Sequence, residues 1–220
     1  MPRAKLKRFD ENKSLPNLLQ EGKEGFDDLK GTWNSAHFKN DLPITIEMGC
    51  GKGEYTIGLA REFKDRNFIG VDIKGDRLWT GSKQAIDENL HQVAFLRTLI
   101  HNIDGFFAPE EIASIWITFP DPRPKDRDIK RRLTSPRFLE MYKTMLNPKG
   151  SVYFKTDNTD LFEYTLEVLN ERKDILDLHF TFDLYGSEYV DDHYGIKTNF
   201  EQKYLDLGTK IKYLKFRFAK

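Results

Sequence analysis

The sequence predicts an α/β protein built around a doubly wound, mostly parallel sheet. From Pro43 onward, short β-rich runs alternate with segments of helical spacing, the pattern of a parallel sheet covered by helices on both faces. A glycine-rich turn follows the first of these runs, at the position where such folds bind ligands. Two β-rich runs near the carboxyl terminus are separated by too little chain for a helical crossover, so we expect them to pair antiparallel at one edge.

Seven strands are expected in this sheet. Each is too short and too rich in β-branched or aromatic residues to form a good helix. They cover residues 43–48, 68–73, 93–98, 112–119, 151–156, 178–185 and 211–218. The first five form the parallel part of the sheet, and the last two form its antiparallel C-terminal edge.

Four helices are expected between the strands. Residues 55–63 and 78–89 each place their apolar side chains on one helical face. The third helix has clear ends, because Ser135 can cap its start and Pro148 follows its last turn. The fourth is expected to start at Asp160, where an acidic residue stands before a run of apolar residues at helical spacing.

Length and composition limit the possible classes of protein. The 220 residues suit one large domain, and the 35 basic and 35 acidic residues exclude a uniformly basic protein that coats nucleic acid. Cys50 is the only cysteine, which excludes an internal disulfide and favours the cytoplasm. No apolar run suits a signal peptide or a membrane span, and the five histidines lack metal-ligand spacing, so we expect neither membrane nor metal. We expect a partly flexible arm at 1–40 and one domain at 41–220.

The glycine turn predicts a cationic ligand. Gly49, Gly51 and Gly53 alternate with other residues, which is one residue tighter than the dinucleotide fingerprint, and Glu54 stands where its third glycine belongs. Glu47 adds a carboxylate just before the turn, so a pyrophosphate would be repelled and a cation attracted. S-adenosylmethionine is such a ligand, with a sulfonium, an ammonium and a ribose but no phosphate.

Asp72 supports this interpretation of the turn. It ends the second predicted strand, 23 residues beyond Gly49, where a carboxylate can accept hydrogen bonds from both ribose hydroxyls. The alternative is that Glu47 and Asp72 are ordinary polar strand ends and the glycines merely shape a turn. Because both carboxylates end neighbouring strands beside the glycines, we favour the cofactor site.

A second motif follows the fourth strand. Asp121 stands between Pro120 and Pro122, and the two prolines hold it on a stiff bend beside the glycine turn. Residues 125–132 come next and contain five basic and two acidic side chains. Such a run is commonly only a solvated face. Beside a cofactor cleft it instead predicts the place where a polyanionic substrate is held.

Together these residues resemble the tRNA (guanine-N7-)-methyltransferases of bacteria, a family of Rossmann-like class I methyltransferases. The resemblance extends from about Leu29 to the carboxyl terminus. It is carried by EMGCGKG at 47–53, FPDP at 119–122, Lys125, KRRL at 130–133, FKTDN at 154–158 and TNFE at 198–201. The glycine turn alone would indicate only a Rossmann-like methyltransferase, whereas the tandem of the later motifs is specific to this family.

The resemblance implies an S-adenosyl-L-methionine-dependent enzyme that modifies tRNA by methylating N7 of guanosine 46 in the variable loop. The implied cofactor-binding residues are Glu47, Gly49, Gly51, Gly53, Asp72, Arg97, Thr98 and Asp121, and Asp121 is also the implied catalytic residue. The implied substrate-binding residues are Lys125, Asp157, Thr198, Asn199, Phe200 and Glu201. The implied RNA contacts are Arg127, Lys130, Arg131 and Arg132.

Two positions depart from the family pattern. Arg123 stands where Trp is usual after FPDP, and either Arg97 or Thr98 stands where an acidic residue or Asn usually lies near the adenine. The sequence does not decide between a monomer and a homodimer.

Two other functions remain possible on the residues alone. A nicotinamide-dependent dehydrogenase is disfavoured because the glycine pattern is too tight. A non-catalytic RNA-binding module would keep the basic run but would not need Asp121 between two prolines.

Methylation of guanine N7 needs no strong general base, since that nitrogen carries no proton, so alignment is the main requirement. Asp121 and Asp157 are the expected acceptors for the N1 and N2 hydrogens of the guanine.

Overall fold

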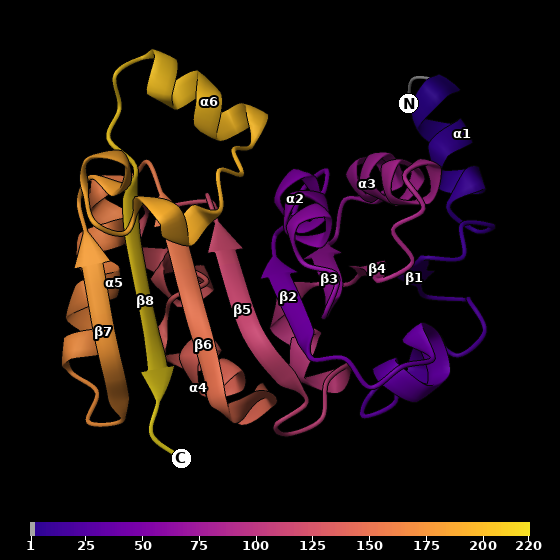
Figure 1. The fold of residues 1–220 in the computed structure, drawn as a ribbon, viewed down its shortest axis with the longest axis horizontal. Coiled ribbons are helices and arrows are strands. Elements are labelled where there is room, and N and C mark those ends of the chain that lie inside the picture. The colour runs from indigo at the N-terminus through magenta and orange to yellow at the C-terminus, as the bar shows by residue number, and fades with distance from the viewer. Residues whose placement is uncertain (1–2) are drawn as a thin grey trace.

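A computed structural model describes residues 3–220 and has one eight-stranded sheet at its centre (Figure 1). The strands are β1 (Leu18–Gln20), β2 (Ile44–Met48), β3 (Asn67–Asp72), β4 (Val93–Arg97), β5 (Ile112–Thr118), β6 (Leu146–Thr156), β7 (Ile175–Thr181) and β8 (Lys212–Phe218). Their order across the sheet is β1-β4-β3-β2-β5-β6-β8-β7. Pairing is parallel from β1 to β6, and β8 is antiparallel to both β6 and β7. The predicted doubly wound, mostly parallel sheet with an antiparallel C-terminal edge is confirmed.

Helices cover both faces of the sheet. The α-helices are α1 (Arg3–Glu11), α2 (Glu54–Glu62), α3 (Gly75–Asp87), α4 (Pro136–Met145), α5 (Thr159–Asn170) and α6 (Asn199–Asp206). The shorter helical turns are η1 (Phe26–Asp28), η2 (Trp33–Phe38), η3 (Ile100–Gly105), η4 (Asp126–Arg131), η5 (Leu184–Gly186) and η6 (Val190–His193). Helices α4 and α5 pack on one face, and α2 and α3 pack on the other. Helix α6 lies above the carboxyl ends of the central strands (Figure 1).

The eighth strand comes from the region expected to be an arm. Strand β1 pairs with β4 in parallel, with Leu18 opposite Phe95, and the Leu18 side chain is fully buried. Trp33 is also fully buried, where its ring stacks on Phe107 and its Nε1 donates to the carbonyl of Phe106 over 2.9 Å. A three-residue strand is too short to show an alternating pattern, so periodicity does not predict it. The flexibility expected for residues 1–40 stays a prediction, and residues 1–2 lie outside the described part of the chain.

The predicted third helix is present, but its ends differ in detail. The Ser135 side chain donates to the carbonyl of Lys130 and makes no capping hydrogen bond to the helix. Helix α4 ends at Met145, and β6 begins at the next residue, Leu146. Pro148 therefore lies in the first part of the strand instead of marking a separate loop.

The predicted fourth helix begins one residue earlier than expected. It starts at Thr159, and its cap is Asn158, whose Oδ1 accepts from the backbone N–H of Leu161 over 2.8 Å. Asn158 therefore has a local structural role that explains its place in the FKTDN sequence.

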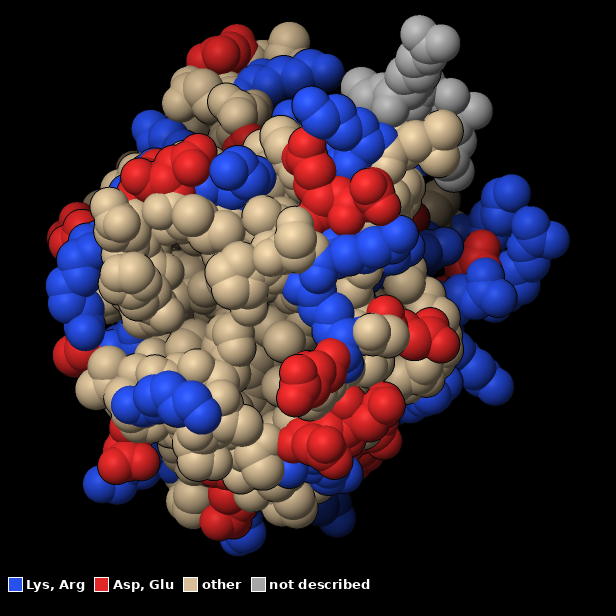
Figure 2. Space-filling model, turned by 90° about the vertical axis from the view of Figure 1, so that its right-hand side faces the viewer, with Lys and Arg blue, Asp and Glu red and all other residues tan. Residues whose placement is uncertain are grey.

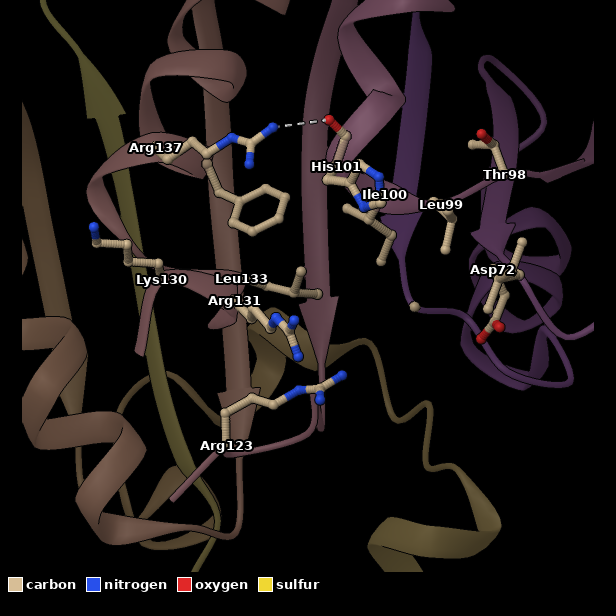
Figure 3. A pocket seen from close by; sticks show the side chains of 13 residues that line it. Asp72, Thr98, Leu99, Ile100, His101, Arg123, Lys130, Arg131, Leu133 and Arg137 are labelled. Carbon is tan, nitrogen blue, oxygen red and sulfur yellow. Dashed lines mark hydrogen bonds between the residues drawn. The ribbon is translucent and has the colours of Figure 1, made fainter. Parts of the chain in front are cut away.

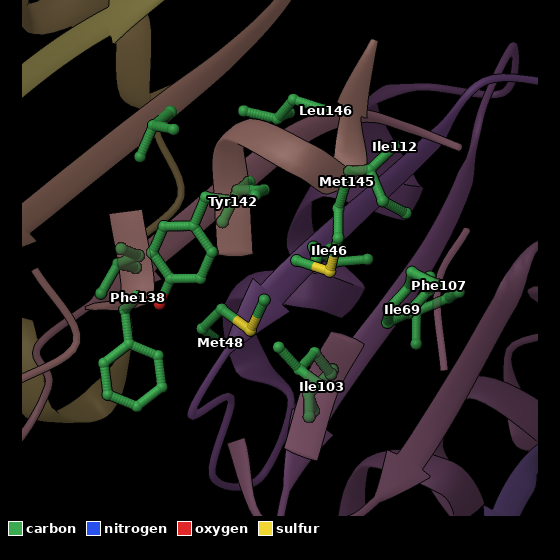
Figure 4. Packing of buried hydrophobic residues seen from close by; sticks show 14 of the residues in the cluster. Ile46, Met48, Ile69, Ile103, Phe107, Ile112, Phe138, Tyr142, Met145 and Leu146 are labelled. Atoms are coloured by element: carbon green, nitrogen blue, oxygen red, sulfur yellow. The ribbon is translucent and has the colours of Figure 1, made fainter. Parts of the chain in front are cut away.

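Alternation along the central strands separates an apolar face from a face with polar groups. Ile46 and Met48 of β2 pack with Ile69 and with Tyr142 and Met145 of α4 in the larger core cluster (Figure 4). On the opposite face of β2, the other side chains are polar.

The polar side chains of this second face meet at the carboxyl edge of the sheet. Glu47 of β2, Thr118 of β5 and Lys155 of β6 share it, and Thr118 pairs in register with Lys155. The fold thus places a row of polar groups under α2 and α6. Within residues 3–220, no helix is both long and apolar enough to cross a membrane.

Candidate cofactor and RNA-binding site

The glycine turn between β2 and α2 has the conformation that its glycines permit. Gly49, Gly51 and Gly53 have φ angles of 75°, 58° and 75°, in the left-handed region that favours glycine. A Cβ on Gly53 would lie 2.5 Å from the ring of Phe95, whereas one on Gly51 would meet no atom within 4 Å. The turn therefore packs tightly at Gly53 but leaves open space beside the backbone of Gly51. A ligand that approaches the main chain needs such a space.

Asp72 lies at the end of β3 beside this turn. Its Oδ2 accepts from the N–H of Gly51 over 3.0 Å, and its Oδ1 accepts from the N–H of Lys74 over 2.9 Å. These two bonds fix the carboxylate on the wall of a cavity of about 490 Å³. We call this the Asp72 cavity. Its lining residues are Gly49, Asp72, Ile73, Thr98, Leu99, Ile100, His101, Arg123, Lys130, Arg131, Leu133, Arg137 and Phe138.

The Asp72 cavity has walls of different chemistry (Figure 3). Asp72 and Thr98 come from the ends of β3 and β4, while Arg123, Lys130 and Arg131 come from the loop after β5 on the other side. Arg137 joins this basic wall from the first turn of α4 and donates to the carbonyl of His101 over 3.4 Å. A cavity with a carboxylate on one side and cations on the other can hold a ribose next to a phosphate backbone.

Glu47 lies in a second, adjacent cavity of about 310 Å³. We call this the Glu47 cavity, and its lining residues are Glu47, Gly49, Cys50, Gly51, Lys52, Glu54, Arg77, Thr118, Phe119, Thr198, Asn199 and Phe200. Gly49 lines both cavities, so the glycine turn separates two halves of one site.

The Glu47 carboxylate is buried and held by threonines. Its Oε1 accepts from Thr118 Oγ1 over 2.6 Å, and its Oε2 accepts from both the backbone N–H and the hydroxyl of Thr56. Burial raises the pKa of Glu47, while the hydrogen bonds from Thr118 and Thr56 and the charge of Lys155 oppose that rise. Glu47 is thus a carboxyl group that three hydrogen bonds hold in a fixed position on the wall of the Glu47 cavity.

The carboxyl-terminal motif forms one wall of the Glu47 cavity. Thr198 caps α6 by accepting from the N–H of Glu201 over 3.0 Å, and Asn199 donates through its backbone N–H to Glu54 over 2.7 Å. The Phe200 ring is 45% exposed and lies 5.3 Å, centroid to centroid, from the ring of Phe119. Three of the four predicted substrate residues in this motif therefore face the cavity.

Glu201 has a different environment from the rest of its motif. Its side chain is fully buried, and its carboxylate contacts Lys155 Nζ at 2.9 and 3.1 Å. This arrangement does not place Glu201 on the cavity wall, where the sequence had suggested a direct substrate contact. Motif reasoning assigns no role to Lys155, and the sequence signal for one is a lysine inside the predicted strand 151–156, which indicates an internal partner.

Asp121 lies at the rim and lines neither cavity. Its side chain is 63% exposed, and its Oδ2 is 3.2 Å from Nε of Arg123, which does line the Asp72 cavity. Phe119 and Arg123, the residues that flank the PDP sequence, have positive φ angles of 49°. Such conformations are uncommon for bulky residues and are typical of constrained functional loops.

The two candidates for the adenine position point in different directions. Thr98 lines the Asp72 cavity. Arg97 instead donates to the carbonyl of Ile73 over 3.2 Å, and its guanidinium lies over the ring of Phe9 in α1. Thr98 is therefore the better candidate for a cofactor contact, and Arg97 connects the sheet to α1.

The remaining substrate and RNA candidates differ in their exposure and in their contacts. Lys125, Arg127 and Lys130 are exposed. Arg132 donates through Nε and Nη2 to the carbonyl of Arg123, and its guanidinium lies over the ring of Tyr164.

Two further candidates have local partners. Arg131 forms an ion pair with Asp128 at 3.1 Å. Asp157 is half-buried, and its backbone carbonyl accepts from Lys212 Nζ over 2.8 Å. The exposed Lys125, Arg127 and Lys130 are therefore freer to contact RNA than Arg131, which has an ion-pair partner, and Arg132, which is hydrogen-bonded within the loop.

The face of the molecule on the β1 side of the sheet has no dominant charge of one sign. Basic and acidic side chains are interspersed there, and a group of Lys and Arg projects at the right-hand edge (Figure 2). This pattern agrees with the formal net charge of zero.

Cys50 is buried beside the glycine turn, where burial and the charges of Glu47 and Asp72 raise the pKa of its thiol well above its usual value. A thiol of this kind is a packing residue, not a nucleophile.

Comparison with known proteins agrees with this geometry. A family model described as "Putative methyltransferase" matches residues 41–214. The 16S rRNA methyltransferase KamB has a similar fold, with a TM-score of 0.61 at 12% identity over 91% of this chain and 96% of that one. An antibiotic-related methyltransferase gives a TM-score of 0.60 at 21% identity, over 81% and 88% of the two chains. The fold and the family model define the chain as a class I, Rossmann-like methyltransferase.

Relatives of higher identity narrow the assignment. The tRNA (guanine-N(7)-)-methyltransferase of Cytophaga hutchinsonii is 49% identical over 219 residues, which cover 99% of each chain. That of Christiangramia forsetii is 47% identical over 219 residues, which cover 97% of each chain. The chain belongs to the tRNA (guanine-N(7)-)-methyltransferase family.

Proposed function

We propose that this chain transfers a methyl group from S-adenosylmethionine to N7 of guanosine 46 in the variable loop of tRNA. One observation supports this most strongly. Two cavities meet at Gly49, with the Asp72 and Glu47 carboxylates on one side and a wall of cations on the other. This combination suits a cationic cofactor beside a polyanionic substrate.

The residues of the site fit the cofactor. Asp72 is fixed by two backbone N–H donors and can accept from the ribose hydroxyls, while Thr98, Ile100 and Leu133 offer a partly apolar wall for the adenine. Open backbone at Gly51 and the fixed carboxyl group of Glu47 suit the amino-acid end of the molecule. When bound, S-adenosylmethionine supplies an electrophilic methyl group on a positively charged sulfur.

The residues of this chain then have to align the acceptor. Guanine N7 has a free lone pair, so no residue needs to remove a proton before attack, and orientation supplies most of the rate. Phe200 and Phe119 form an apolar surface at the Glu47 cavity on which the base can stack. Asp121 and Asp157 are proposed to accept from N1 and N2 of the guanine, and their charge offsets the positive charge that the base gains.

Asp121 has to leave its present partner to do this. Its carboxylate contacts Arg123 at the rim, so we propose that the bound guanine replaces Arg123 as the partner of Asp121. Lys125, Arg127, Lys130 and Arg131 are proposed to contact RNA phosphates and so to offset the few kcal/mol needed to unstack the base.

The test uses unmodified tRNA and S-adenosylmethionine with a labelled methyl group. The product is subjected to reductive chain scission at 7-methylguanosine, which locates the modified position. We expect label in tRNA and cleavage at position 46, and no label in a tRNA that carries adenosine there. Labelling of a different atom, or equal labelling of the adenosine-46 control, would contradict the proposal.

A further inference from the structure

Lys155 and Glu201 form a buried ion pair between β6 and α6. Lys155 Nζ lies 3.1 Å from Oε1 and 2.9 Å from Oε2 of Glu201, and both side chains have no exposed surface. The Tyr185 hydroxyl also donates to Glu201 Oε1 over 2.9 Å, and Lys155 Nζ lies 4.3 Å from the ring centroid of Tyr55. Both charges are therefore fully enclosed by specific partners.

A buried pair of this kind needs an explanation other than stability. Removing two charges from water costs several kcal/mol for each ion, and apolar side chains of similar volume are often at least as stabilising. Burial lowers the pKa of Lys155, while the charges of Glu201 and Glu47 oppose that change. What an ion pair adds is a defined geometry, because the ammonium and the carboxylate have one favourable arrangement.

Helix α6 depends on this contact for its position. Among the described residues of α6, Glu201 is the one whose side chain is buried. Tyr204 and Leu205 are only partly buried against the apolar cluster, Phe200 is 45% exposed, and Leu207, just after the helix, is 69% exposed, so Glu201 is the most deeply anchored side chain of the helix. Lys155, in contrast, is on β6, which is paired on both sides, in parallel with β5 and antiparallel with β8.

The position of Glu201 determines the wall of the Glu47 cavity. The N–H of Glu201 donates to the capping side chain of Thr198, and Phe200 is its neighbour in the chain. Phe200 in turn meets Phe119, the last residue before the PDP sequence. A displacement of Glu201 would therefore move the surfaces on which the acceptor base is proposed to stack.

We propose that Lys155 and Glu201 are a pair of positioning residues that holds α6, and with it Thr198 to Phe200, over the Glu47 cavity for the acceptor base. This inference rests on the proposed function for the identity of that base. It assigns Glu201 an indirect role through the helix position, without a contact to the substrate, and it assigns Lys155 the same role.

The first test measures the helix position without catalysis. Hydrogen–deuterium exchange of peptides from 198–206 is compared between the wild-type protein, Lys155→Met and Glu201→Gln. We expect exchange in this segment to rise by roughly tenfold in both variants, while β2 and β5 keep their protection. Unchanged exchange at 198–206 in both folded variants would overturn the proposal, whatever the enzyme methylates.

A double variant separates positioning from global stability. Lys155→Met/Glu201→Leu removes both charges of the pair together and leaves Glu47 with its hydrogen bonds from Thr56 and Thr118, so we expect thermal unfolding near that of the wild type. We still expect fast exchange at 198–206, because the apolar pair lacks the directed contact and the bond to Tyr185. A double variant with wild-type exchange and wild-type activity would show that the ion pair is dispensable and would overturn the proposal.

The kinetic test distinguishes positioning from direct substrate contact. A misplaced wall should reduce kcat/KM for tRNA by about 100-fold in each single variant, with no further loss in the double variant. The affinity for methylthioadenosine, which lacks the amino-acid end that meets Glu47, should stay within about threefold, because Asp72 and Thr98 do not contact the pair. Loss in Glu201→Gln with full activity in Lys155→Met would instead indicate direct contact and overturn the proposal.

The matched control is Lys143→Met. It removes an ion pair of similar length, 2.7 Å to Asp174, away from both cavities. We expect wild-type exchange at 198–206 and wild-type turnover in this variant.

Discussion

The basic loop, residues 125–132, offers a prediction that the structure makes quantitative. Three neighbouring cations differ in how free they are. Lys130 is exposed and has no carboxylate within 4.0 Å among the described residues, Arg131 contacts Asp128 at 3.1 Å, and Arg132 donates twice to the carbonyl of Arg123. We therefore expect Lys130→Gln to weaken tRNA binding most, Arg131→Gln less, and Arg132→Gln least.

The size of the effect follows from counterion release. One phosphate contact contributes about 0.7 to 0.9 to the slope of log K against log salt. Losing the contact of Lys130 should reduce the slope by that amount and weaken binding at about 0.15 M salt by roughly four- to sixfold, or about 1 kcal/mol. Arg132→Gln should change the slope by less than about 0.3, since its guanidinium is already used inside the loop.

Fluorescence anisotropy of labelled tRNA, measured between about 0.05 and 0.3 M potassium chloride, gives these slopes directly. Lys149→Gln is the matched control, because Lys149 is exposed near the amino-terminal end of β6, away from both cavities. An unchanged slope in Lys130→Gln, or a larger change in Arg132→Gln than in Lys130→Gln, would refute the assignment of this loop as the RNA contact.

Three further predictions concern separate parts of the site and fold. Asp121→Ala should abolish methyl transfer in a turnover assay and keep tRNA binding within a few-fold, and full activity would remove Asp121 from the mechanism. Gly81→Ala should lower the free energy of unfolding in urea by about 1–3 kcal/mol, because its Cβ would lie 2.5 Å from the carbonyl of Lys52, whereas Gly105→Ala, with open space around it, should not. The guanidinium of Arg172 lowers the pKa of Asp174 to about 2, so wild type should exceed Asp174→Asn in stability above about pH 4, with the difference shrinking as pH falls toward 2 in urea titrations. A pH-independent difference would contradict that last assignment.

The sequence was sufficient for the parts of the site that depend on strand order. Parallel strands end at one edge, so carboxylates in the last residues of β2 and β3 had to lie near the glycine turn, and Glu47 and Asp72 do so. Thr98 follows β4 and therefore also lies at this edge, where it lines the Asp72 cavity. The resemblance also implied that Thr198 and Phe200 contact the substrate, and both line the Glu47 cavity.

Features that depend on packing between distant segments could not be predicted. The direction of Arg97 is set by contacts with Phe9 and Ile73, and β1 forms because Leu18 finds a buried place beside β4. The pairing of Lys155 with Glu201 joins residues 46 positions apart. Nothing in local periodicity connects such residues, since the contact exists only once α6 lies over the sheet.

The central claim is that the linked Asp72 and Glu47 cavities hold a cationic methyl donor and not a dinucleotide. Isothermal titration calorimetry of the purified, folded chain with S-adenosylhomocysteine and, separately, with NADH tests it most directly. We expect one-site binding of S-adenosylhomocysteine, lost in Asp72→Ala, and no measurable binding of NADH. Binding of NADH without any heat from S-adenosylhomocysteine or S-adenosylmethionine would contradict the account.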